Sequence, residues 1–174
     1  RIRPEALPAT REHLRWAARD DDQDYTILGL DILETYGPNF TTTQVGEKWL
    51  KKLPYMQVYT AERQAYRNLV EGFVPPQTAI RWNPYREWIG AQIRADGFAY
   101  AAPGWMELAA EFAWRDAALS HVKNGIYGEM FFAAAISAAF VARDVQQVIH
   151  LALEEIPRAS RFARMVVECL EWCE

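Results

Sequence analysis

The sequence contains few cysteines and histidines, the residues that stabilise a small fold through disulfides or bind a metal through sulfur and nitrogen. It has two cysteines, Cys169 and Cys173, and three histidines in 174 residues. Two thiols do not make a disulfide framework, and no histidine lies near them to complete a zinc site. We therefore interpret both as reduced, packed thiols and expect a cytoplasmic protein.

Long apolar runs and concentrated positive charge are also missing. The longest apolar run, residues 130–142, contains Ser137 and is too short to cross a bilayer. No signal peptide is visible, and because the chain starts at Arg1 we expect its natural N-terminus to lie upstream. The formal net charge is −4 and the basic residues are scattered, which argues against direct binding to nucleic acid or to an anionic membrane.

No segment shows the alternating pattern of a strand, whereas helical apolar spacing recurs along the chain. The length suits one domain, so we predict an all-α fold in which residues 1–174 form a single helical domain or part of a larger one. Residues 98–104 are expected to be an irregular connection. The expected helices cover about residues 25–36, 44–53, 60–69, 84–96, 105–119, 127–141, 145–155 and 161–172.

The alanine-rich run from Tyr127 to Val141 is apolar on nearly all sides. A helix without a polar face must be covered by other elements in order to avoid water. Its small side chains also permit neighbouring helices to approach closely. We therefore expect this helix at the centre of the fold.

Four carboxylates, those of Asp20, Asp21, Asp22 and Asp24, fall within five residues. They repel one another, and a divalent cation would remove that cost. Carboxylate oxygens are hard ligands that suit Mg²⁺, Ca²⁺ or Mn²⁺. The alternative is an acidic helix N-terminus, stabilised by the helix dipole and solvated. Composition by itself favours this second interpretation.

The segment Asp20-Asp21-Asp22-Gln23-Asp24-Tyr25-Thr26-Ile27-Leu28-Gly29-Leu30 resembles the Thr-Asp-Asp-Thr metal motif of the ADP-ribosylglycohydrolases and the helix that follows it. The resemblance implies that Asp21 and Asp22 are catalytic metal ligands and that Asp20 is a further ligand in the place of threonine. The implied cofactor is Mg²⁺, or Mn²⁺ in its place. Gln23 stands where the family has its second threonine.

A second stretch is similar to the central region of the same family. It runs from Asn83 through Ala117 and then through the Ser120-His121 pair to the Ala-rich run. In the family this region lines the ADP-ribose cleft, with a loop near the equivalent of Asp96-Gly97. The substrate-binding residues that the resemblance implies are Asp96, Gly97, His121, Asn124, Gly125, Tyr127 and Gly128. From the residues themselves, 124–128 are equally a turn followed by close helix packing.

Two motifs of that family do not occur here. The sequence contains no Gly-Asp dipeptide upstream of the acidic motif and no Asp-x-Asp-Thr segment after it. In the family the second of these completes a two-metal site. The resemblance therefore implies a piece of such an enzyme or a degenerate relative.

The leading hypothesis is hydrolysis of an ADP-ribosyl N- or O-glycosidic bond, with an ADP-ribosylated substrate or ADP-ribose as the partner. The rival is an ADP-ribose-binding or helical interaction domain without catalysis. A catalytic triad of Ser120, His121 and Asp116 is rejected because adjacent serine and histidine side chains do not normally face each other. The sequence predicts neither the leaving group nor the oligomeric state.

Overall fold

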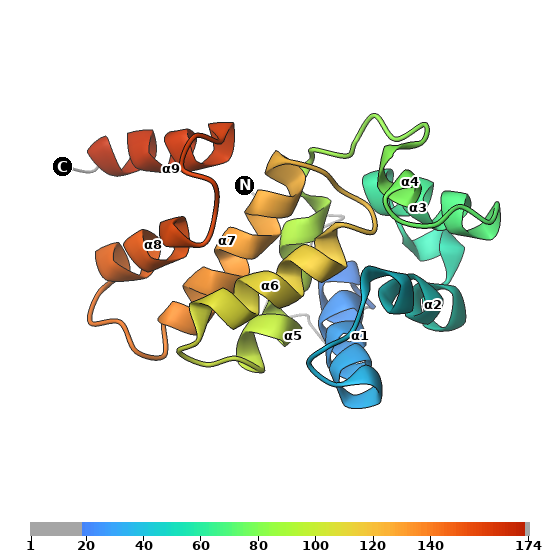
Figure 1. Ribbon diagram of the computed structural model, residues 1–174, viewed down its shortest axis with the longest axis horizontal. Coiled ribbons are helices and arrows are strands. Elements are labelled where there is room, and N and C mark those ends of the chain that lie inside the picture. The colour runs from blue at the N-terminus through green and yellow to red at the C-terminus, as the bar shows by residue number, and fades with distance from the viewer. Residues whose placement is uncertain (1–18, 173–174) are drawn as a thin grey trace, which may run out of the picture.

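The computed structural model describes residues 19–172, and every regular element among them is a helix (Figure 1). The all-α prediction is therefore confirmed. Cys173 lies outside the described residues, and Cys169 is exposed on the last helix, so the packed-thiol prediction is wrong for it. In chain order the elements are α1 (Asp21–Tyr36), α2 (Thr42–Lys52), η2 (Tyr55–Gln57), α3 (Thr60–Val70), α4 (Gln77–Ile80), η3 (Ile89–Arg94), α5 (Ala95–Tyr100), α6 (Met106–Ala117), α7 (Asn124–Ala138), α8 (Val145–Glu154) and α9 (Arg161–Glu171).

Short polar side chains fix where the helices begin. Thr41 and Gln44 form a capping box at the start of α2, in which each side chain bonds the other residue's backbone N–H. Asp144 accepts the Gln147 N–H at 2.8 Å to begin α8, and Ser160 accepts the Ala163 N–H at 3.0 Å to begin α9. These starts follow the predicted ones because capping chemistry is local and visible in the sequence.

Helix α7 lies at the centre of the molecule, as expected from its apolar circumference (Figure 1). It packs against α5, α6, α8, α9 and η3. Ala133, Ala134 and Ala138 are fully buried, and their small side chains let the neighbouring backbones come close. Helices α2, α3 and α4 lie at one end of the molecule, and α8 and α9 lie at the other (Figure 1).

Two apolar clusters form the core. The larger joins α1, α2, α5 and α6 and contains the ring cluster of Phe40, Phe98 and Phe112, whose centroids lie 5.4 to 6.4 Å apart. The smaller lies between α6, α7, α8 and α9 around Phe131 and Ile156. Burying an aromatic or large aliphatic side chain stabilises the fold by roughly 1.5–3 kcal/mol. The larger cluster holds α1, and hence the acidic triplet, in place.

The helix predicted from Asn83 to Asp96-Gly97 is wrong. Residues 81–88 form turns, and the chain then passes through η3 directly into α5. The Asn83 side chain is buried and donates to the carbonyls of Ala61 (3.2 Å) and Ser120 (2.9 Å), so it ties this segment to two others instead of simply starting a helix. Buried carbonyls that lose such donors cost about 1–3 kcal/mol each.

Asp96 and Gly97 consequently lie within a helix and not in a loop, and α5 continues to Tyr100, where an irregular connection was expected. A Cβ on Gly97 would lie 2.8 Å from the carbonyl oxygen of Thr26. Glycine is therefore required for α5 to approach α1. Its role in the fold is close packing, which residue spacing did not reveal because the contact partner is about 70 residues away.

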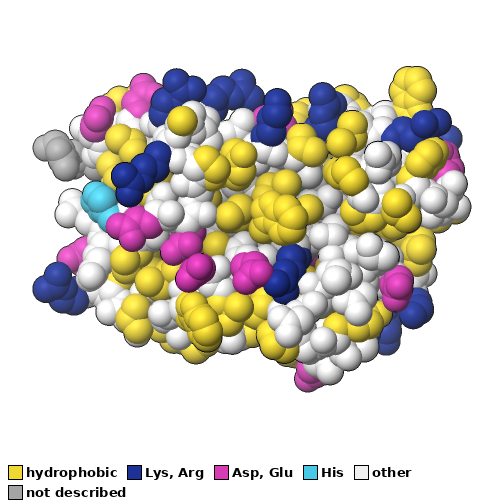
Figure 2. Space-filling model, in the orientation of Figure 1, with side chains coloured by type: hydrophobic (Ala, Val, Ile, Leu, Met, Phe, Trp, Pro, Cys, Tyr) yellow, Lys and Arg dark blue, Asp and Glu magenta, His cyan; other side chains and the backbone are white. Residues whose placement is uncertain are grey.

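Apolar side chains reach the surface between scattered charged ones on the face shown in Figure 2. Several tryptophans are exposed, among them Trp82, Trp88 and Trp105. Isolated apolar groups are ordinary on a protein surface, so only those beside a pocket bear on function. Within residues 19–172, no helix combines the length and the apolar character that crossing a bilayer requires.

Candidate functional site

The acidic triplet lies where α1 begins. Asp20 is the N-cap residue, in extended backbone conformation, and its Oδ1 accepts the Asp22 N–H at 3.0 Å. This turn gathers the three side chains, and one carboxylate oxygen from each of Asp20, Asp21 and Asp22 lies within 4.8 Å of the other two. Asp21 is half-buried, whereas the other two are exposed.

The triplet offers the hard oxygen ligands that a divalent cation of the Mg²⁺ class prefers. Adjacent oxygen ligands in an octahedral Mg²⁺ site lie about 3.0 Å apart, since each ligand bond is about 2.1 Å, so oxygens as far apart as 4.8 Å would have to approach each other by more than an ångström to bind one ion. Partial burial, the hydrogen bond with Asp20 and the charges of Asp20, Asp21 and Asp96 raise the pKa of Asp22. A cation would relieve this repulsion. The helix N-terminus stabilises the same negative charges without a metal, which is the competing interpretation.

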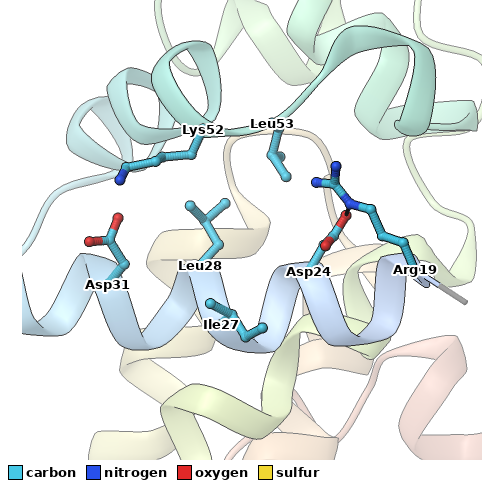
Figure 3. A pocket seen from close by; sticks show the side chains of 7 residues that line it. All are labelled: Arg19, Asp24, Ile27, Leu28, Asp31, Lys52 and Leu53. Atoms are coloured by element: carbon cyan, nitrogen blue, oxygen red, sulfur yellow. Dashed lines mark hydrogen bonds and ion pairs between the residues drawn. The ribbon is translucent and has the colours of Figure 1, made fainter. Parts of the chain in front are cut away.

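The fourth carboxylate of the acidic segment does not join this cluster. Asp24 turns toward Arg19, whose Nε lies 2.6 Å from its Oδ2. The pair borders a separate pocket between α1 and the end of α2, in which the side chains of Lys52 and Asp31 point toward each other (Figure 3). Because its partner already balances its charge, Asp24 has less need of a cation than the triplet has.

A pocket of about 300 Å³ opens beside the triplet. Its walls come from the start of α1, the start of α3, and η3 with the residue before it. A polar depression adjoins it and shares Asp21 and Tyr59 with it, next to Asp20 and Arg19. The residues that line the pocket are Asp21, Asp22, Tyr25, Tyr59, Thr60, Glu62, Trp88, Ile89, Gly90 and Ile93.

Behind this pocket lies a buried ionic cluster around Arg94. The guanidinium contacts Glu62 Oε1 at 3.1 Å, Asp116 Oδ2 at 2.5 Å and Glu129 Oε2 at 3.5 Å, and it donates to Ser120 Oγ at 2.9 Å. All four charged side chains are at most 4% exposed. Ions taken out of water in this way are tolerated only when paired, so Arg94 holds four segments of the chain together.

Three acids face one arginine in this cluster, so they cannot all be ionised cheaply. Burial, followed by the charge of Asp116, raises the pKa of Glu129 well above its usual range. Burial by itself lowers the pKa of Arg94, but Asp116, Glu129 and Glu62 outweigh it and the pKa is raised. We assign the retained proton to Glu129, which leaves Asp116 and Glu62 to balance Arg94.

The sequence interpretation missed this cluster. In the sequence Asp116 stands apart from the other aspartates, and nothing in the spacing of Glu62 or Arg94 marks either residue as buried. The visible signal was Glu129, a single acid within the apolar run 127–141. A charge on a helix that is otherwise apolar all round needs a buried partner, but the sequence does not say which.

His121 lies behind the pocket and not at its surface. The ring is fully buried, its Nδ1 lies 2.8 Å from Ser120 Oγ, and its Nε2 lies 4.0 Å from Glu62 Oε1. Burial, and then the positive charge of Arg94, lowers the pKa of His121 to about 3. The argument that adjacent Ser120 and His121 cannot face each other is therefore wrong. Both are nevertheless buried, and Asp116 bonds Arg94, so no exposed triad results.

The other residues that were predicted to contact substrate lie in two separate parts of the structure. Asp96 lies close enough to the triplet to raise the pKa of Asp22. Asn124 instead bonds Glu87 Oε2 at 2.8 Å and the Phe162 N–H at 3.1 Å, which ties the start of α7 to α9. Tyr127 packs against the smaller apolar cluster.

The two glycines at the start of α7 serve close packing. A Cβ on Gly125 would lie 2.7 Å from the Arg86 carbonyl oxygen, and one on Gly128 would lie 2.5 Å from Gln92 Nε2. These contacts favour the packing interpretation over phosphate binding for this segment. None of the predicted contacts on α5, in the 120–121 turn or on α7 lines the pocket beside the triplet.

Comparison with known proteins gives one match. The model of the family described as ADP-ribosylglycohydrolase matches residues 3–174. That range includes the acidic triplet, the pocket and the buried cluster. Searches of curated proteins and of solved structures each found no match.

Proposed function

Since the chain belongs to the ADP-ribosylglycohydrolase family, we propose that it hydrolyses an ADP-ribosyl N- or O-glycosidic bond with a divalent cation, Mg²⁺ or Mn²⁺, at Asp20, Asp21 and Asp22. The observation that carries the proposal is the clustering of the three carboxylates beside a pocket. Family membership extends over nearly the whole chain and supplies the reaction class.

The roles of the residues follow from their positions. When bound, a divalent cation supplies Lewis acidity and a template for oxygen atoms. Asp21 borders both the pocket and the adjoining polar depression, so its carboxylate is placed to orient a water and to take its proton. Attack at the anomeric carbon passes through an oxocarbenium-like transition state. The negative charges of Asp21 and Asp22 stabilise that positive charge.

The rival function is binding of ADP-ribose without turnover. Among residues 19–172 the triplet is the one group of three possible metal ligands that comes together. A two-metal reaction needs a second set, because both ions must hold the water and the substrate oxygens at once. The absence of an Asp-x-Asp-Thr segment from the sequence is the feature that favours the rival.

We expect the 174-residue chain by itself to release little ADP-ribose from ADP-ribosyl-arginine or O-acetyl-ADP-ribose. A longer natural chain that carries an Asp-x-Asp-Thr segment should release it in a Mg²⁺-dependent way, because a second carboxylate set would then be present. EDTA and the double change Asp21→Asn/Asp22→Asn should each abolish release. The assay is chromatographic detection of free ADP-ribose.

The control is Glu34→Gln/Glu47→Gln, which also removes two carboxylates but from exposed positions on α1 and α2. It should release ADP-ribose at the wild-type rate. A longer chain that binds ADP-ribose but cleaves neither substrate would establish the rival function. Full activity of the 174-residue chain would overturn the requirement for a second carboxylate set. A cytoplasmic location is part of the proposal and is tested by fractionation of the source cells.

A further inference from the structure

The groove between α8 and α9 is an apolar surface that the described part of the chain leaves open. The two helices lie at one end of the molecule and run in opposite directions (Figure 1). The groove between them has a volume of about 380 Å³. At its two helices, Val145 is 72% exposed and Val167 is 44% exposed. Its apolar lining consists of Val145, Ile149, Leu153, Val167 and Leu170.

Helix α9 has more apolar surface than the described chain covers. It packs against α7, and of its 11 residues Ala163 is the one that is buried. Phe162 and Val166 pack against the smaller apolar cluster, whereas Val167 and Leu170 face the groove. An apolar helix face left in water marks a surface that binds a further partner. This side of α9 therefore suits a second apolar surface.

The charges on this side of α9 run against the helix dipole. Arg164 lies near the start of α9 and Glu171 is its last residue, whereas the dipole favours acids at a helix start and bases at its end. Both side chains are exposed, and neither forms an ion pair within residues 19–172. Their spacing of three and four residues from Val167 places all three on one face of the helix. The face thus carries a base, an apolar side chain and an acid in that order.

We propose that this face binds a second copy of the chain, with the two α9 helices antiparallel and Val167 beside the twofold axis. Antiparallel pairing about Val167 places Arg164 of each copy opposite Glu171 of the other copy. The order of base, apolar group and acid is therefore complementary to itself, as a twofold interface requires. Val167 and Leu170 of each copy then pack against the apolar groove of the other.

The size of the face sets the strength of this association. A helix of 11 residues is about 16 Å long, and the face is two helices wide. Such a contact is smaller than the roughly 800 Å² per partner of stable complexes. The dimer should therefore be weak and should form in proportion to the concentration of the chain.

Sedimentation velocity of the full 174-residue chain at increasing concentrations tests the proposal. The wild type should shift from monomer to dimer. Val167→Asp should weaken dimerisation about tenfold or more, because it buries a carboxylate without a partner. Arg164→Glu and Glu171→Arg should each weaken it about tenfold, because each brings like charges together at two places in the dimer. All three positions are exposed, so the thermal midpoints of the monomers should stay at the wild-type value.

A mixture of Arg164→Glu with Glu171→Arg tests the antiparallel arrangement. The first variant has acids at both positions and the second has bases at both, so a mixed dimer regains opposite charges at each contact. It should form as tightly as the wild-type dimer. The matched control is Arg67→Glu, which reverses an exposed charge on α3 at the other end of the molecule (Figure 1). This variant should dimerise as the wild type does.

A wild-type chain that stays monomeric at every concentration would overturn the proposal. A dimer that Val167→Asp leaves intact would lie on another face and would overturn it as well. Failure of the two mixed variants to associate would exclude the antiparallel arrangement. A longer natural chain that remains monomeric would assign the groove to its own downstream residues and not to a second copy. The proposed hydrolysis stands or falls separately from these results.

Discussion

Replacing Arg94 with methionine should lower the free energy of unfolding at neutral pH by about 3–5 kcal/mol, the usual cost of leaving buried charges without their partner. Arg94 is 1% exposed and is the cation that Glu62, Asp116 and Glu129 share. Methionine fills much of the same volume, so the loss reports charge and not a cavity. Urea denaturation followed by circular dichroism measures it.

The loss should be smaller in acid, because protonation neutralises the carboxylates of Asp116 and Glu62 that Arg94 leaves behind, while Glu129 already holds a proton. The control is Arg67→Met, which removes an exposed pair with Glu71. Exposed pairs contribute about 0–1 kcal/mol, so this variant should unfold nearly as the wild type does. Equal effects of the two substitutions would show that the buried cluster does not hold the fold together.

His121 should make the protein lose stability as the pH falls from 7 to 4.5. The pKa of His121 is about 3 in the folded chain, against about 6.5 in the unfolded one. Between those values the unfolded state binds a proton that the folded state excludes, so acid favours unfolding. At 1.36 kcal/mol per pH unit, the two units from 6.5 to 4.5 correspond to about 2–3 kcal/mol.

Other groups titrate in the same range, so the comparison is with His121→Gln measured at each pH. The stability of the wild type relative to this variant should fall as the pH is lowered, because the variant has no imidazole to protonate. His150→Gln is the control, since it removes an exposed imidazole and leaves His121 in place. A wild-type advantage over His121→Gln that stays constant from pH 7 to pH 4.5 would contradict burial of a neutral imidazole.

Local signals explain which parts of the fold could be predicted. The starts of α2, α8 and α9 follow from capping residues within four positions of each helix start. The central place of α7 follows from its composition. The segment 83–97 was predicted wrongly because its conformation depends on contacts with distant carbonyls, those of Ala61 and Ser120. No local pattern encodes such contacts.

The candidate site likewise has a part that the sequence could predict and a part that it could not. Asp20, Asp21 and Asp22 are adjacent in sequence, so a single helix start brings them together, and the sequence could indicate this. Tyr25, Glu62 and Gly90 meet only because α1, α3 and the entry to η3 converge. Residues 121–128 are next to recognisable motif positions in the sequence. In the fold, however, His121 lies behind the pocket and Asn124 lies at the α7–α9 junction.

The central claim is that the acidic triplet holds a divalent cation, and calorimetric titration with Mg²⁺ or Mn²⁺ tests it most directly. The wild-type chain should bind one ion weakly, because three carboxylates without a second set form an open site. Asp21→Asn/Asp22→Asn should show no binding heat, and Glu34→Gln/Glu47→Gln should retain it. Identical heats for the wild type and Asp21→Asn/Asp22→Asn would mean that the triplet is only a helix cap.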